Sequence, residues 1–222
     1  MLALVWTLYL MAASILMLAM VGRGGVGDLS IYRPAARGLA LSIMLGVCVL
    51  WPCVRLSQVR PTRGGLVASA QDIPIILIPS LAVILPQAAL GGWGVMPILL
   101  MSVVAGSWTI LIGGLLAIAQ GRAALKLQHD TGAGRFDAKG RVFWMLVVLA
   151  VGVLGVILGT ARPDPSGPDL SLISPYESPF SILVSGSGSA PPPTAEDFVI
   201  ASVPGIIGCG LIGVAFARHR RI

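Results

Sequence analysis

Long runs of apolar residues, separated by short charged segments, constrain this chain more than any motif in it. Of its 222 residues 56% are hydrophobic and only 11% are charged, whereas charged residues make up about a quarter of an ordinary soluble domain. About 20 consecutive apolar residues cross the hydrocarbon core of a bilayer as a helix. The runs therefore predict an all-α polytopic membrane protein, a single integral membrane domain over residues 1–222.

The apolar runs predict about six transmembrane helices. They lie at 1–22, 39–54, 66–90, 95–120, 142–161 and 198–217. The first run lacks the basic start of a secretory signal peptide, so we expect it to remain as an uncleaved span. The second is the shortest and contains Pro52, and we expect its end to lie at the membrane interface with Trp51 at headgroup depth.

The basic residues favour one orientation of these spans. Eleven of the 15 lysines and arginines fall on the side that would hold both termini. Because cytoplasmic segments are enriched in lysine and arginine, we expect both termini to be cytoplasmic in a multi-pass protein of the plasma membrane. Segment 121–141 is then a basic cytoplasmic loop, and 162–197 is an extracytoplasmic loop. The four basic residues on the opposite side are Arg23, Arg33, Arg37 and Arg162.

The net charge of +6 follows from this topology and from attraction to anionic headgroups. Membrane lipids are therefore expected partners, and the basic balance needs no nucleic acid to explain it.

The loop at 162–197 has two different halves. Residues 185–195 begin SGSGSAPPP, which is typical of a flexible tract running into a stiffer polyproline-like one. Residues 170–184 are richer in apolar side chains, and Ser174 and Ser178 each precede a proline, where they can cap a short helix. We expect 170–184 to form short re-entrant or interfacial helices before the last span.

The third run holds the polar residues that most resemble a site. Asp72 is the only acid inside any apolar run, and an intramembrane carboxylate is costly unless it is paired, protonated or hydrated. Gln71, Asp72 and Gln87 are therefore candidates for a polar path or an intramembrane pairing. The alternative is that Asp72 lies near the membrane surface and pairs with Arg60 or Arg63.

Small residues repeat at helical spacing along the last run. Gly205, Cys209, Gly213 and Ala217 form one stripe, and such stripes allow close contact between membrane helices. The stripe is a candidate helix-packing face within the chain or the face of a homodimer.

Motifs for catalysis or cofactor binding are weak. Residues 22–27, GRGGVG, match GxGxxG but follow a membrane span rather than a strand. No GxxxxGK[ST] phosphate loop occurs, and neither His129 nor His219 has ligand-type neighbours at metal spacing. We expect no enzyme activity, catalytic residue, metal or cofactor, and any nucleotide energy would have to come from a partner.

The layout of the chain resembles the permease subunits of type-2 ABC exporters, mainly over 95–217. The resemblance rests on the basic loop after LLAIAQGRAALKL and on LISPYESPF before the last span. It implies a dimer of permeases driven by separate ATPase subunits, which would press on cytoplasmic elements around 55–65 and 121–141. It also implies short re-entrant helices on the outer side.

Two functions follow as hypotheses. The first is a permease-like subunit of a multi-component transporter, which moves a substrate with energy from a separate ATPase subunit. The alternative is a non-catalytic scaffold or anchor subunit of a larger membrane complex, which small size and packing stripes suit equally well.

Overall fold

The chain folds into a bundle of helices, and its computed structural model describes residues 2–21, 29–58, 65–87, 91–127, 138–160, 170–184 and 192–219. Within these ranges there are helices and turns but no strand, which confirms the all-α class. The elements are α1 (Leu2–Val21), α2 (Leu29–Leu45), the π-helix η1 (Gly46–Leu50), α3 (Trp51–Ser57), α4 (Gly65–Ile84), α6 (Val95–Leu127), α7 (Ala138–Thr160), the 3₁₀ helix η2 (Leu170–Ile173), α8 (Ser178–Val184) and α9 (Ala195–His219).

Membrane-spanning character is confirmed by the lengths and composition of the helices. Five stretches in the described part of the chain are long and apolar enough to cross a bilayer: Leu2–Ala19, Tyr32–Ser57, Gly65–Ile84, Val95–Gln120 and Ala195–Arg218. The 23-residue α7 coincides with the remaining expected span at 142–161. About six crossings therefore agree with the structure.

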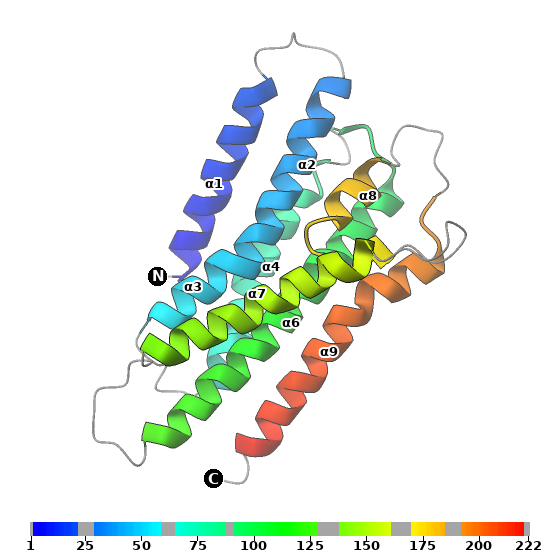
Figure 1. The fold of residues 1–222 in the computed structure, drawn as a ribbon. Helices are drawn as coiled ribbons and strands as arrows, with labels where there is room; N and C mark the ends of the chain where they lie inside the picture. The colour runs from blue at the N-terminus through cyan, green and yellow to red at the C-terminus, as the bar shows by residue number, and fades with distance from the viewer. Residues whose placement is uncertain are drawn as a thin grey trace.

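Successive long helices run in alternating directions through the bundle (Figure 1). The start of α1 and the end of α9 lie at the same end, which we call the terminal end, and we call the opposite end the distal end. Helix α6 packs against α4 and α9, whereas α7 crosses the bundle obliquely and packs mainly against η2, α3 and η1.

The second span begins earlier than its apolar run predicts, because two arginines do not end the helix. Arg33 Nε donates to the carbonyl of Gly91 at 3.1 Å, and Arg37 Nη2 donates to the carbonyl of Leu183 at 3.1 Å. Charged side chains are tolerated in membrane helices when they reach polar partners. These contacts account for two of the arginines that lie on the less basic side.

The second half of this span contains the π-helix η1, which ends two residues before Pro52. Proline has no amide hydrogen, and its ring crowds the carbonyl four residues earlier, so a regular helix cannot pass through it undisturbed. Trp51 is fully buried inside the bundle, with 0% of its surface exposed. The Trp51 indole therefore packs inward against other helices rather than facing lipid, and its headgroup depth stays a prediction.

The segment 170–184 enters the bundle from the distal end, which confirms the predicted re-entrant element. Trp108 Nε1 of α6 donates to the carbonyl of Ile173 at 3.2 Å. Trp108 lies thirteen residues after the start of α6, so the contact is about 20 Å along that helix from the distal end. Ser174 Oγ accepts hydrogen bonds from the amides of Tyr176 and Glu177, at 3.3 and 3.1 Å, and closes the turn between η2 and α8.

The side chain of Tyr176 makes further contacts between the re-entrant segment and the spans. Its hydroxyl contacts the thiol of Cys48 in η1, and a Cβ built on Gly152 of α7 would lie 3.2 Å from the same hydroxyl. Tyr176 thus joins the re-entrant segment to two spans at once.

The two predicted loops are only partly described. Helix α6 continues to Leu127 and α7 begins at Ala138, so helix covers both ends of the expected basic loop at 121–141, while 128–137 lie outside the described residues. Within 162–197, residues 162–169 and most of the expected linker, 185–191, also lie outside them, and α9 begins at Ala195.

Candidate functional site

A buried ion pair lies near the terminal end, between α3 and α4. Asp72 lies seven residues after the first residue of α4, or about 10 Å along the helix. Arg55 lies two residues before the last residue of α3. Segment 58–64 separates the two helices in sequence, so the pair joins the helices on either side of it.

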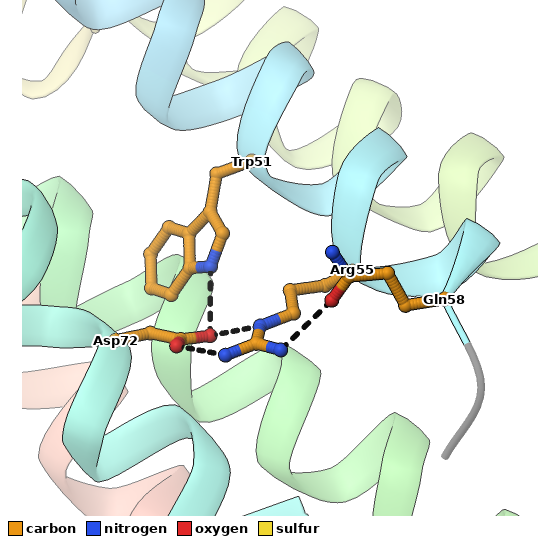
Figure 2. Close-up of polar contacts among 4 residues, drawn as sticks. All are labelled: Trp51, Arg55, Gln58 and Asp72. Atoms are coloured by element: carbon orange, nitrogen blue, oxygen red, sulfur yellow. Dashed lines mark hydrogen bonds and ion pairs between the residues drawn. The ribbon is translucent and has the colours of Figure 1, made fainter. Parts of the chain in front are cut away.

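The side chains of the pair meet in a fork (Figure 2). Nε and Nη2 of Arg55 donate to the two carboxylate oxygens of Asp72. Trp51 Nε1 donates to Asp72 Oδ2 at 3.2 Å, and Arg55 Nη1 donates to Gln58 Oε1 at 2.9 Å. The carboxylate therefore accepts three hydrogen bonds, and this bidentate geometry is the strongest form of an arginine–carboxylate contact. We call these four residues the Asp72 cluster.

Burial makes the pairing necessary. Asp72 is 1% exposed, and the Arg55 side chain is 20% exposed. A Cβ built on Gly113 of α6 would lie 3.3 Å from the Trp51 ring and 3.0 Å from Ile73, so α6 passes close behind the cluster and excludes water there. Removing one partner of a buried pair typically costs about 3–5 kcal/mol, because the other charge is left uncompensated.

The cluster carries one negative and one positive charge. It has no unpaired carboxylate to offer a metal or a proton-transfer reaction. What it does physically is hold α3 and α4 together across segment 58–64.

The structure does not bring Gln71, Asp72 and Gln87 together. Gln71 is exposed on another face of α4. Gln87 lies 15 residues beyond Asp72, towards the distal end, where its Nε2 donates to the carbonyl of Val83 at 3.1 Å. Arg60 and Arg63 lie outside the described residues, and the partner that the structure gives Asp72 is Arg55.

The small-residue stripe of α9 turns away from α6 along its length. Gly205 is buried, and a Cβ there would lie 3.2 Å from Ser107. Cys209, Gly213 and Ala217 are exposed, and a Cβ on Gly213 would meet nothing within 4 Å in the described part of the chain. Gly205 therefore serves packing within the chain, and the other three lie on the outer surface.

A very close approach of α9 to α6 lies at Gly208, which the stripe does not include. A Cβ on Gly208 would lie 2.6 Å from the backbone of Leu111, and one on Gly114 would lie 2.8 Å from the carbonyl oxygen of Gly208. Positions four residues apart drift by about 40° per step around a helix with 3.6 residues per turn. The stripe Gly205-Cys209-Gly213 consequently leaves the interface that Gly205 and Gly208 share.

Sequence reasoning missed Trp51, Arg55 and Gln58 as members of the site. The spacing of four residues places Trp51 and Arg55 on one face of a helix, this face turns towards α4, and Gln58 follows directly after the last residue of α3. This spacing was the signal available in the sequence. It puts Arg55 on the same helix face as Trp51, and in the structure that face meets Asp72.

No protein-family model, no curated protein and no solved structure matches this chain. The functional conclusions therefore rest on the geometry of the chain itself.

Proposed function

We propose that the protein is a permease-like subunit of a multi-component transporter in the plasma membrane, which moves a substrate with energy from a separate ATPase subunit. The observation that carries this proposal is the Asp72 cluster, because it joins the two helices that flank segment 58–64. In the resemblance to type-2 ABC exporters, this segment is where the ATPase presses.

A push on segment 58–64 would act on α3 and α4 together. Arg55 and Asp72 hold these helices by two hydrogen bonds in fixed orientation, so α3 does not slide past α4 without breaking the pair. Because a bidentate contact fixes direction as well as distance, the two helices respond as one body.

About one turn of helix separates the cluster from a residue that touches the re-entrant segment. Trp51 of the cluster lies three residues after Cys48 of η1, and Cys48 contacts the hydroxyl of Tyr176. π-helical turns often occur at functional sites, where they change the local helix register. In this proposal η1 passes displacement of α3 to the re-entrant segment, which enters the bundle from the distal end.

The scaffold function is favoured by a different observation. Only 17% of the residues in the span of α1 and 22% of those in the span of α9 are buried. These helices offer their faces to lipid or to helices of other proteins. A subunit that anchors a larger complex would use such faces, and it would need no ATPase.

Affinity purification in mild detergent, with identification of the recovered proteins, distinguishes the two functions. The permease proposal predicts recovery of a P-loop ATPase, and it predicts that Arg55→Gln weakens this recovery or uncouples ATP hydrolysis from transport. Arg218→Gln is the matched control, because Arg218 is an exposed arginine at the same end of the bundle. Absence of any ATPase under conditions that preserve complexes overturns the proposal, and stable recovery of a respiratory or photosynthetic complex supports the scaffold.

A further inference from the structure

A groove runs along α7 where it crosses the second span. It is an open groove with a volume of about 550 Å³. Cys48 and Val49 of η1 form one wall, and Met145 and Leu149 are among the apolar side chains of α7 that form the other. Arg141 is the only charged residue among those that line it, so the groove is apolar except at one end.

The α7 wall of the groove is somewhat shorter than one leaflet of a bilayer. Its α7 wall extends from Arg141 to Leu149, which is about 12 Å at 1.5 Å per residue. Half of the hydrocarbon core is about 15 Å thick. An acyl chain of one leaflet therefore fits along α7, with its polar end at Arg141.

The charge at that end has no partner in the described part of the chain. No hydrogen bond or ion pair engages the Arg141 guanidinium there, although the residue is half-buried. A guanidinium binds the oxygens of a phosphate through two parallel hydrogen bonds. Arg141 lies towards the terminal end of α7, the end expected to be cytoplasmic, where anionic lipid attracts basic residues.

Among the described residues, a second copy of the chain has no carboxylate placed to pair with Arg141. Four acids belong to the described residues, and one of them, Asp72, is buried and paired. Glu177, Glu196 and Asp197 belong to the re-entrant segment and the start of α9, both towards the distal end. Parallel copies in one membrane would not place these acids beside Arg141.

We propose that this groove binds one anionic phospholipid, with an acyl chain between α7 and η1 and its phosphate on Arg141. The site is independent of the ATPase, so its test does not depend on the transport proposal. Its chemical requirement is a headgroup with a net negative charge, whose phosphate has no cationic group of its own beside it, together with a chain long enough to follow α7 to Leu149.

Native mass spectrometry of the purified full-length protein tests the site. The probes are phosphatidylglycerol and phosphatidylcholine with identical acyl chains, each titrated into delipidated protein in the same detergent. Wild-type protein should retain phosphatidylglycerol in preference to phosphatidylcholine. Arg141→Gln should weaken phosphatidylglycerol binding about fivefold, the effect expected of one basic residue at a membrane surface, whereas Lys139→Gln, an exposed lysine on the same helix, should not.

A second variant tests the apolar part of the groove separately from the charge. Leu146 lines the groove, and Leu146→Trp should reduce retention of both lipids because the larger side chain fills the groove. Phe143→Trp is the control, because it places an indole at an exposed position outside the lining, and it should reduce retention of neither lipid. Equal retention of both lipids by wild-type protein, or unchanged phosphatidylglycerol binding in Arg141→Gln, overturns the proposal. Recovery of a lipid-free dimer that Leu146→Trp disrupts overturns it as well, in favour of contact between copies.

Discussion

Loss of Arg55 should destabilise the protein more than loss of Asp72, although the two residues form one pair. The substitution Arg55→Gln leaves the Asp72 carboxylate, which is 1% exposed, with Trp51 Nε1 as its only remaining donor among the contacts seen. The substitution Asp72→Asn leaves Arg55, whose side chain is 20% exposed and keeps its bond to Gln58. A long basic side chain near a helix end can extend towards water, whereas a short buried carboxylate cannot.

The magnitudes follow from these surroundings. Removing one partner of a buried pair costs about 3–5 kcal/mol, and we expect Arg55→Gln to lie at the lower end of this range, at about 3 kcal/mol. For Asp72→Asn we expect about 1.5 kcal/mol, the value of a hydrogen bond to a charged group, because the new amide still accepts from Trp51. The double variant leaves no charge uncompensated and should cost about 2 kcal/mol, which implies a coupling energy of about 2.5 kcal/mol.

Equilibrium unfolding in mixed detergent and SDS micelles, followed by tryptophan fluorescence, measures these free energies. Arg218→Gln is the control, since a substitution at an exposed position should change the unfolding free energy by less than about 0.5 kcal/mol. The reasoning is refuted if Asp72→Asn is the more destabilising single change. It is also refuted if the double variant loses the sum of the two, because the charges would then act independently.

Two further predictions concern packing and topology. Gly208→Ala should lower the free energy of unfolding by about 1–3 kcal/mol, the usual range for overpacking, because the new Cβ would lie 2.6 Å from the backbone of Leu111. Gly210→Ala, whose Cβ meets nothing within 4 Å in the described part of the chain, should be neutral in the same assay. Equal costs for the two variants would contradict the α6–α9 packing. A fluorescent protein fused after residue 222 should fluoresce, and alkaline phosphatase inserted in 185–191 should be active in intact cells; the reverse result would invert the proposed orientation.

The existence of the spans follows from the sequence because bilayer thickness sets a length that composition alone can reveal. The apolar runs at 66–90 and 95–120 predict α4 and α6 closely in their central parts. The start of the second span was predicted about ten residues too late. Arg33 and Arg37 interrupt the apolar run, and only the folded chain supplies the carbonyls of Gly91 and Leu183 that they reach.

At the candidate site, too, the sequence identifies one residue but not the contacts that it makes in the folded chain. Asp72 was identified because an acid inside an apolar run is costly. The sequence suggested Arg60 or Arg63, in the basic segment before α4, as its partner, whereas the helix of the second span continues through Pro52 by way of η1 and carries Arg55 to it. A π turn changes which residues face a neighbour, and no periodic pattern in the sequence announces it.

The sequence predicted that residues 170–184 form short helices, but not how far they extend into the bundle. Its apolar side chains and Ser-Pro pairs indicated short helices, and these are present. That Trp108 and Tyr176 would tie it to α6, η1 and α7 depends on contacts between residues far apart in the sequence.

The bond between Arg37 and Leu183 has a consequence for how the protein is made. The two residues are 146 positions apart, and chains are synthesised at about 5–20 residues per second, so the second span waits about 7–30 s for this acceptor after Arg37 leaves the ribosome. Until Leu183 has been made, Arg37 is in the membrane region without this acceptor. Water or lipid headgroups must then offset the free-energy cost of its charge. The bundle therefore closes late in biosynthesis, and chains that end before residue 183 should be recognised as unassembled by membrane quality control.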